Sequence, residues 1–172
     1  MKCGIDDVRL SFVADGDRDL IRSIEDEPAG NAMANVLPRS AGAFDRHWVR
    51  IMTSPTVVTR IVEVRDGNAW HRAGFVTSFL TSFPVRGESS ERRCVGYRLG
   101  ERWWGRGFMR IALGRFLEDV VCERPLWAVT AAENIASQRV LSRCGFDVID
   151  RRWTPATGRY PAGDEVVVWL EG

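Results

Sequence analysis

The stretch VGYRLGERWWGRGFM, residues 95–109, decides the fold of this chain. Apolar residues alternate at Val95, Tyr97 and Leu99, which is typical of a β-strand with one buried face. The alternation stops where glycine becomes frequent, and a different periodicity begins after the second tryptophan. The stretch therefore predicts a strand that ends in a glycine-containing turn.

A helix is predicted directly after this turn, over residues 107–121. Apolar residues recur there at three- and four-residue steps, which places one stripe of the helix against a core. The members of that stripe are Phe108, Ile111, Ala112, Phe116, Val120 and Val121. Gly105 and Gly107 consequently lie just before or at the start of the helix.

A strand, a Gly-X-Gly turn and a helix together predict an anion site. The first backbone amides of a helix have no partner within the helix, and the helix dipole adds partial positive charge there. Small residues let a diphosphate approach the main chain, and Arg102 and Arg106 add charge. The chain has neither the P-loop motif nor the three-glycine dinucleotide motif. A tight turn that exposes arginines for solubility is the alternative interpretation.

The remainder of the chain alternates between predicted strands and helices. Strands are expected at 7–13, 56–64, 70–80, 93–99, 126–131, 146–153 and 164–170, and helices at 17–27, 31–37, 43–52, 107–121 and 134–144. Pro28 and Gly30 are expected to end the first helix, and residues 87–92 to form a polar loop. The pattern favours an α/β fold with a mixed sheet in one domain, residues 1–172.

Charge and cysteine content exclude several classes of partner. The formal net charge is +1, which predicts neither a nucleic acid nor an anionic membrane as partner. Four cysteines lie far apart, without the spacing of a zinc site, so we expect reduced thiols and no metal: Cys3, Cys94, Cys122 and Cys144. The sequence has no apolar leader and no apolar run of about 20 residues, and a cytoplasmic location is expected.

Two motifs in order resemble those of a known superfamily. Arg102-x-x-Gly105-x-Gly107 resembles the (Gln/Arg)-x-x-Gly-x-(Gly/Ala) signature of the GNAT N-acetyltransferases, and the segment from Asn134 through Ser137 to Gly145-Phe146 resembles their Asn-x-x-Ser helix. The likeness is greatest to the ribosomal-protein N-terminal (alanine) acetyltransferase branch. It implies a mostly antiparallel central sheet that splays between the fourth and fifth strands, with flanking helices.

The resemblance also implies which residues bind acetyl-coenzyme A. Pantetheine would enter the splay, pair with main-chain groups and receive a hydrogen bond from an asparagine, while amides of the turn would bind the pyrophosphate. The cofactor-binding residues implied in this way are Arg98, Leu99, Arg102, Trp104, Gly105, Arg106, Gly107, Phe108, Met109 and Asn134. Ser137 would lie near the sulfur, either as a proton donor or as a small residue that permits close helix packing.

Catalysis requires a neutral amine and a stabilised leaving thiolate. Glu91 is the predicted base beside Ser137 as the predicted acid, and the other base candidates are Glu63, His47 and His71. The sequence departs from the family twice. Many relatives have an acidic residue where Arg93-Cys94 stands, and many have an acid tyrosine where Leu141 stands.

These observations predict an acetyl-CoA-dependent N-acetyltransferase. The acceptor would be a primary amine, either a protein N-terminal α-amine or a small molecule, that attacks directly in a ternary complex. The alternatives are a non-catalytic acyl-CoA sensor of the same fold and an arginine-rich interaction protein with an incidental turn. A homodimer is a further expectation, with the strand at 164–170 as an edge available for pairing.

Overall fold

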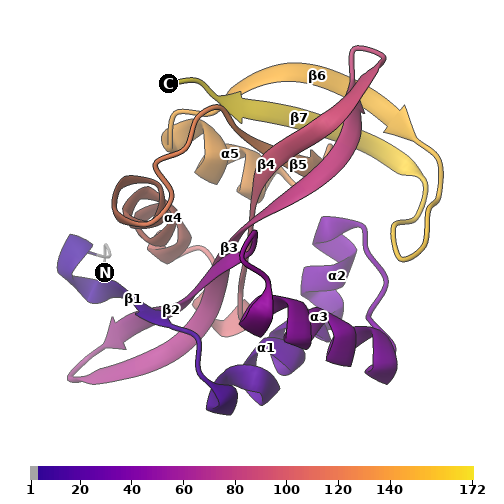
Figure 1. Ribbon diagram of the computed structural model, residues 1–172. Coiled ribbons are helices and arrows are strands. Elements are labelled where there is room, and N and C mark those ends of the chain that lie inside the picture. Colours follow the sequence, from indigo (N-terminus) through magenta and orange to yellow (C-terminus); the bar gives the residue numbers. More distant parts are fainter. Residues whose placement is uncertain (1–3) are drawn as a thin grey trace.

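The computed structural model describes residues 4–172 and contains one seven-stranded sheet in the order β1-β2-β3-β4-β5-β7-β6 (Figure 1). The strands are β1 Val8–Phe12, β2 Val58–Asp66, β3 Ala69–Val85, β4 Glu88–Leu99, β5 Leu126–Ala131, β6 Asp147–Thr154 and β7 Gly163–Leu170. The helices are α1 Arg18–Glu25, α2 Pro28–Ala34, α3 Ala41–Thr53, α4 Phe108–Asp119 and α5 Ile135–Arg143. Three 3-10 turns are also present: η1 Ile5–Asp7, η2 Asp15–Asp17 and η3 Glu101–Trp103. The predicted mixed α/β fold is confirmed.

The sheet opens between β4 and β5. These strands run parallel and share a single registered pair, Cys94 with Trp127, whereas all the other neighbouring strands are antiparallel. Residues 95–99 pair fully with β3 on their other side. The predicted splay between the fourth and fifth strands is therefore confirmed, and it begins immediately after Cys94.

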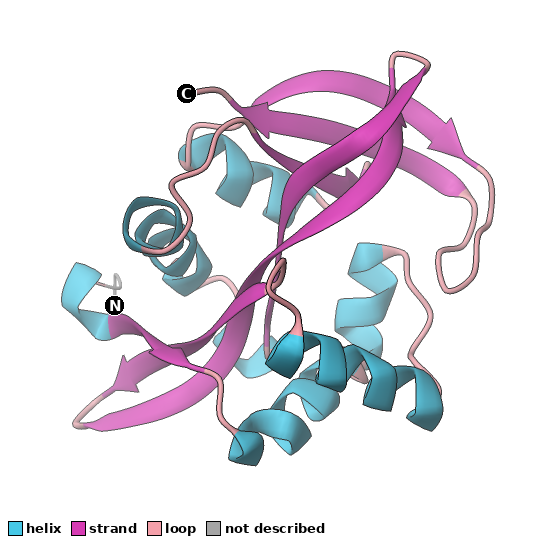
Figure 2. Cartoon of the chain, viewed as in Figure 1, coloured by secondary structure: helices cyan, strands magenta, loops and turns pink. Residues whose placement is uncertain are grey.

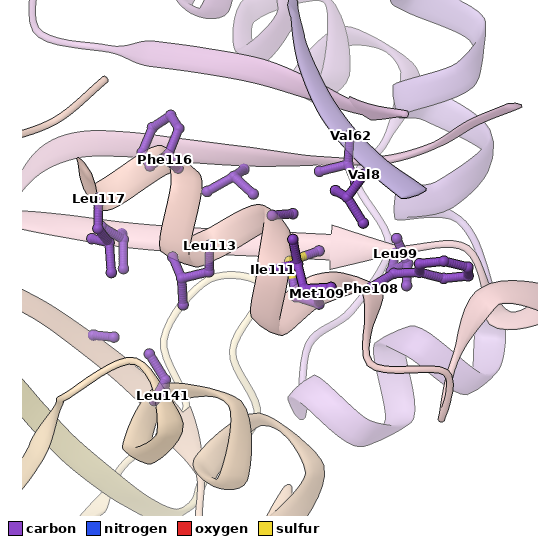
Figure 3. Close-up of a cluster of buried hydrophobic side chains, with 14 of the residues drawn as sticks. Val8, Val62, Leu99, Phe108, Met109, Ile111, Leu113, Phe116, Leu117 and Leu141 are labelled. Carbon is purple, nitrogen blue, oxygen red and sulfur yellow. The ribbon is translucent and has the colours of Figure 1, made fainter. Parts of the chain in front are cut away.

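Helices cover both faces of the sheet (Figure 2). Helices α4 and α5 lie on one face and α1, α2 and α3 on the other (Figure 1). The larger core lies under α4, whose apolar side chains pack against the sheet and against Leu141 of α5 (Figure 3). Met109, Leu113 and Leu117 are buried in addition to the predicted stripe, so α4 is buried over a wider arc than its periodicity indicated.

Two predicted boundaries were wrong. Pro28 begins α2 instead of ending α1, because proline at the first helical position loses no hydrogen bond and has a helix-compatible φ. The expected loop at residues 87–92 is the beginning of β4, whose residues pair with β3 from Glu88 onward. The turn is shorter than predicted, because Arg86 and Gly87 both have positive φ and reverse the chain within two residues.

The predicted edge strand was also misplaced. Strand β7, which contains the segment 164–170, lies between β5 and β6 and is hydrogen-bonded on both sides. The edge at this end of the sheet is β6. Pairing of two copies through β7 is therefore excluded, because its main-chain groups are already used within the sheet.

Three of the four cysteines fall in the described part of the chain, and Cys94, Cys122 and Cys144 are free thiols. Cys3 lies outside the described residues. Between residues 4 and 172, no helix is long and apolar enough to cross a membrane.

Candidate functional site

A cavity of about 380 Å³ lies at the splay and extends to the start of α4. Its walls come from the α1–α2 segment, the end of β4, the turn before α4, and the exposed side of α5. The lining residues are Ile24, Glu27, Gly30, Met33, Ala34, Tyr97, Arg98, Leu99, Trp103, Trp104, Gly105, Gly107, Phe108, Met109, Arg110, Asn134, Ala136, Ser137, Arg139, Val140 and Arg143. The cavity thus brings together most of the cofactor-binding residues predicted from the two motifs.

The glycine turn forms the end of the cavity at α4. Gly105 and Gly107 have φ values of +71° and +85°, and Gly107 is the residue that caps α4. A side chain at either position would project into open space, since no atom outside the turn lies within 4 Å of its β-carbon position. No side chain therefore covers the backbone at the start of α4, so a ligand can approach it. The first amide hydrogens of a helix have no acceptor within the helix and can bind such a ligand.

The arginines of this region divide into two groups. Arg102 stacks on Trp103, with 4.3 Å from its guanidinium carbon to the ring centroid, and Arg106 donates to Asp66 Oδ1 at 2.8 Å; neither lines the cavity. The exposed arginines that do line it are Arg110, Arg139 and Arg143. Sequence reasoning missed these three, although Arg139 and Arg143 stand one helical turn apart on α5 and share a face.

Asn134 and Ser137 are held together at the start of α5. Asn134 caps the helix, because its Oδ1 accepts a hydrogen bond from the Ser137 amide at 3.0 Å. That bond uses the side-chain oxygen and leaves the side-chain nitrogen Nδ2 of Asn134 as a donor. Both Asn134 and Ser137 line the cavity. Asn134 is therefore both the N-cap of α5 and part of the cavity wall.

Tyr97 is the functional candidate that sequence reasoning missed. Its hydroxyl lies 2.8 Å from Ser137 Oγ and 3.2 Å from the Ser137 carbonyl oxygen, and the tyrosine lines the cavity. Burial raises the pKa of Tyr97 above its usual 10, although the hydrogen bond with Ser137 opposes the shift. The phenol therefore stays protonated at neutral pH. The available signal in the sequence was that Tyr97 is the one polar member of the alternating set Val95, Tyr97 and Leu99, which predicted the buried face of the strand.

Main-chain groups at the end of β4 are available in the splay. Beyond Cys94, no residue of β4 has a registered partner on β5. The carbonyl oxygen of Leu99 is not available, because it accepts a hydrogen bond from Trp104 Nε1 at 2.6 Å. This bond fixes the Trp104 ring against the end of β4. Arg98 and Leu99, which the resemblance placed beside the pantetheine, both line the cavity.

The predicted base candidates lie outside the cavity. Glu91 is exposed on the β3–β4 hairpin, six residues before Tyr97, which corresponds to about 20 Å along a strand. Glu63 is buried and paired with Arg9, His47 is 3.2 Å from Glu25, and His71 packs on Trp103. Among the described residues that line the cavity, Glu27 is the single carboxylate, and its Oε2 accepts the Glu101 amide at 3.0 Å.

Glu25, at the end of α1, contributes to the stability of the fold in a pH-dependent way. Its side chain is 6% exposed and lies 2.9 Å from Arg39 and 3.2 Å from His47. Burial alone would raise the pKa of Glu25, but the hydrogen bonds and charges of His47 and Arg39 outweigh it and lower the pKa from 4.5 to about 2. A pKa lower in the folded state than in the unfolded state means that ionised Glu25 stabilises the fold above pH 4.5, and that this contribution is lost as the pH falls toward 2.

We expect Glu25→Gln to lower the free energy of unfolding by roughly 3 kcal/mol at pH 7 and by about half of that or less at pH 3. Urea denaturation of both proteins at pH 7, 5 and 3 measures this difference. Glu123→Gln is the control, because the ion pair of Glu123 with Arg93 is exposed and its loss changes the free energy by about 0.5 kcal/mol or less. A pH-independent deficit in Glu25→Gln would contradict the assignment.

Comparison with known proteins agrees with this geometry. The spermidine N-acetyltransferase from Vibrio cholerae, solved with CoA and spermine, has a TM-score of 0.77 at 14% identity over 96% of this chain and 96% of that one. The ribosomal-protein-S5-alanine acetyltransferase from Vibrio fischeri has a TM-score of 0.68 at 18% identity over 95% of this chain and 92% of that one. At such identities these likenesses establish the fold. No curated protein matches the chain.

The family itself is established by sequence. The acetyltransferase (GNAT) domain family matches residues 11–147, a span that contains the glycine turn, the splay, and the Asn134–Ser137 helix start. Both motifs singled out in the sequence therefore lie inside the matched region and on the walls of one cavity. The chain belongs to the GNAT acetyltransferase family, whose co-substrate is acetyl-CoA, as the resemblance of those motifs implied.

Proposed function

We propose that this chain acetylates a primary amine by direct attack in a ternary complex with acetyl-CoA. The observation that carries the proposal is the continuity of the cavity. It runs from the bare amides at Gly105 and Gly107 to the hydroxyl pair of Tyr97 and Ser137. A diphosphate at one end and a thioester at the other are the two groups of acetyl-CoA that such an arrangement would separate and hold.

The residues present fit that co-substrate. Open space over two glycines in the left-handed region accommodates a diphosphate at the start of α4, and Arg110, Arg139 and Arg143 add positive charge on the cavity wall. The unpaired edge of β4 and the side-chain nitrogen Nδ2 of Asn134 would form hydrogen bonds with the pantetheine arm. Acetyl-CoA, when bound, supplies the activated acetyl group. Arg102 and Arg106 would act indirectly, through Trp103 and Asp66, by fixing the turn.

Tyr97 and Ser137 would stabilise the negative charge that develops on the departing sulfur. One hydrogen bond joins their two hydroxyls, and either oxygen can be the donor. When Tyr97 donates to Ser137 Oγ, the Ser137 hydroxyl hydrogen remains for a ligand, whereas when Ser137 donates, the Tyr97 hydrogen is directed to the Ser137 carbonyl oxygen. The first arrangement would therefore let Ser137 serve as donor with Tyr97 behind it, without rearranging the backbone. Tyr97 would in this way replace the tyrosine that many relatives have at the position of Leu141, which is 1% exposed and belongs to the core.

The amine must lose its proton before it attacks. An α-amine with a pKa near 8 is partly neutral at pH 7, whereas a lysine side chain near 10.4 is almost wholly charged. Glu91 would need a relay over about 20 Å to act as base. The geometry therefore favours an acceptor of low pKa that releases its proton to water, since Glu27 is the single carboxylate among the described residues of the cavity wall.

A non-catalytic acyl-CoA sensor is the second candidate, and the burial of Leu141 in place of an acid tyrosine favours it. Calorimetry with acetyl-CoA, run beside a thiol-release assay, distinguishes the two. The acceptor panel contains peptides with different N-termini, amino acids, spermidine and aminoglycosides. We expect binding together with amine-dependent release of CoA. Binding without release would support the sensor, and absence of binding would refute the assignment of the cavity to acetyl-CoA.

A further inference from the structure

Consecutive residues of β4 look in opposite directions at the splay. Tyr97 reaches α5, where it meets Ser137, whereas Arg98 reaches the opposite face and its Nη1 donates to Asn31 Oδ1 of α2 at 2.9 Å. A β-carbon built at Gly30 would lie 3.5 Å from the same nitrogen, so the guanidinium is pressed against α2. Arg98 therefore enters the cavity from the α1–α2 wall, opposite the hydroxyl pair.

Two other arginines gather around Arg98, and Arg39, Arg98 and Arg159 are here called the arginine cluster. Arg159 belongs to the β6–β7 loop, and this loop contacts the segment that follows α2 through the Leu37 amide, which donates to the Arg159 carbonyl at 2.7 Å. Burial lowers the pKa of Arg98 and of Arg159. The charge of Arg39 lowers both pKa values further, while the charge of Glu25 opposes the shift in both. Three like charges thus lie within electrostatic range of one another, and Arg98 is the member of the cluster that lines the cavity.

Carboxylates of the protein neutralise only part of this charge. Glu25 is engaged by Arg39 and His47. Arg98 donates to an amide oxygen and Arg159 Nε to the Leu37 carbonyl at 2.8 Å, and neither forms a salt bridge within residues 4–172. Arg159 Nη2 is buried without any hydrogen-bond partner in that range. A buried guanidinium nitrogen without an acceptor is costly, and an anionic oxygen would satisfy it.

The amine must reach the splay from this side. The opposite side of β4 is closed by α5 and by the Tyr97–Ser137 hydrogen bonds, and the remaining wall is formed by Met33 and Ala34 of α2 together with Arg98. Glu27 is the single carboxylate among the described residues of the cavity wall, and it already accepts the Glu101 amide. A polycation would therefore meet one engaged carboxylate and several arginines, which disfavours its binding.

We infer that the acceptor is an amine whose molecule also carries a carboxylate, and that Arg98, assisted by the charge of Arg159, binds this carboxylate while the amine faces the splay. The inference rests on the acetyl transfer proposed above and adds the chemical class of the acceptor. A guanidinium binds a carboxylate through two parallel hydrogen bonds, which fixes the direction as well as the position of the ligand. An amino acid has both groups, and its α-amine has the lower pKa that the cavity favours.

The test compares amino acids with their carboxamides, and with spermidine, in thiol release by the full chain at saturating acetyl-CoA. A carboxamide keeps the amine and the side chain and removes the negative charge. We expect the best amino acid to exceed its carboxamide by about tenfold or more in kcat/KM, and Arg98→Met to bring this ratio close to one. Arg98→Lys should restore part of the ratio. A carboxamide or spermidine as the best acceptor would overturn the inference.

Two further variants serve as controls for the effect of Arg98→Met. Arg50→Met removes a guanidinium on α3 that bonds the Leu80 carbonyl and lies outside the cavity wall, and we expect it to keep the ratio of the parent chain. Arg159→Gln supplies a second variant in case Arg98→Met fails to fold, and it should lower the ratio as well. A ratio unchanged in folded Arg98→Met and Arg159→Gln would remove the cluster from acceptor binding.

Product binding separates failure of this inference from failure of the proposed function. Calorimetry of the CoA-saturated chain with an N-acetyl amino acid and with its carboxamide requires no turnover. A carboxylate preference of about tenfold that Arg98→Met abolishes would support the anion site, even if no amine caused release of CoA. Absence of release would then refute acetyl transfer but not the anion site. Equal binding of the two products would overturn the anion site and leave acetyl transfer standing.

Discussion

Gly107→Glu should weaken acetyl-CoA binding by about a hundredfold or more, measured as Kd by calorimetry. The new carboxylate would enter the open space over the turn, where the structure favours a diphosphate. Two unit charges 4 Å apart at a partly exposed site repel by about 4 kcal/mol, and 2.7 kcal/mol already corresponds to a hundredfold change in Kd. The left-handed φ of +85° adds strain that lowers stability by about 1 kcal/mol.

Gly87→Glu is the matched control. Gly87 has a φ of +87° and likewise no atom within 4 Å of its β-carbon position, but it lies in the β3–β4 turn outside the cavity. Both variants therefore add the same charge and the same strain. We expect Gly87→Glu to lose similar stability and to bind acetyl-CoA as the parent chain does. Equal Kd values for the two variants would refute the anion site at the start of α4.

Tyr97→Phe is expected to lower kcat by about a hundredfold with little change in the Kd of acetyl-CoA. The substitution keeps the packed ring and removes the hydroxyl that pairs with Ser137 Oγ at 2.8 Å. Positioned proton donors contribute on the order of a hundredfold or more to rate, and the loss falls on kcat because the charge they stabilise develops only during the reaction. Thiol release at saturating substrates measures kcat, and calorimetry measures Kd.

The partner substitution makes this prediction sharper. Ser137→Ala in the Tyr97→Phe background should cost much less than Ser137→Ala alone, because two residues that act as a unit are not additive. Ser142→Ala, which removes an exposed hydroxyl from the same helix α5, should leave kcat unchanged. A Tyr97→Phe variant with the kcat of the parent chain would exclude the hydroxyl pair from the reaction.

The cofactor half of the site could be predicted from sequence because it depends on local geometry. A strand, a turn with two glycines and an amphipathic helix follow one another within residues 95–121, and the amides of such a turn point outward whatever surrounds them. Asn134 was predictable for the same reason, since a capping side chain bonds an amide three residues away. These are the parts of the site in which the chain specifies its own neighbours.

The other half depends on contacts between distant segments, which a single sequence does not display. Tyr97 meets Ser137 across 40 residues, and Arg98 meets Asn31 across 67. The place of β7 inside the sheet follows from its pairing with β5 and not from its position at the end of the chain. Glu91 was a base candidate because it lies just before the predicted strand, but β4 already begins at Glu88, and Glu91 is exposed on the β3–β4 hairpin.

The single registered pair of Cys94 with Trp127 makes the sheet two half-sheets with one joint between them. Contacts bridge the halves on both sides of that joint. Arg86 at the β3–β4 turn bonds Asp150 and Ile149 of β6, while Leu37, in the segment after α2, bonds Arg159 of the β6–β7 loop. The width of the slot between β4 and β5 is then set by these outer contacts. A substrate that shifts the Leu37–Arg159 contact would therefore change the spacing between β4 and β5, and with it the binding of acetyl-CoA. The two ligands would in this way be coupled through the sheet.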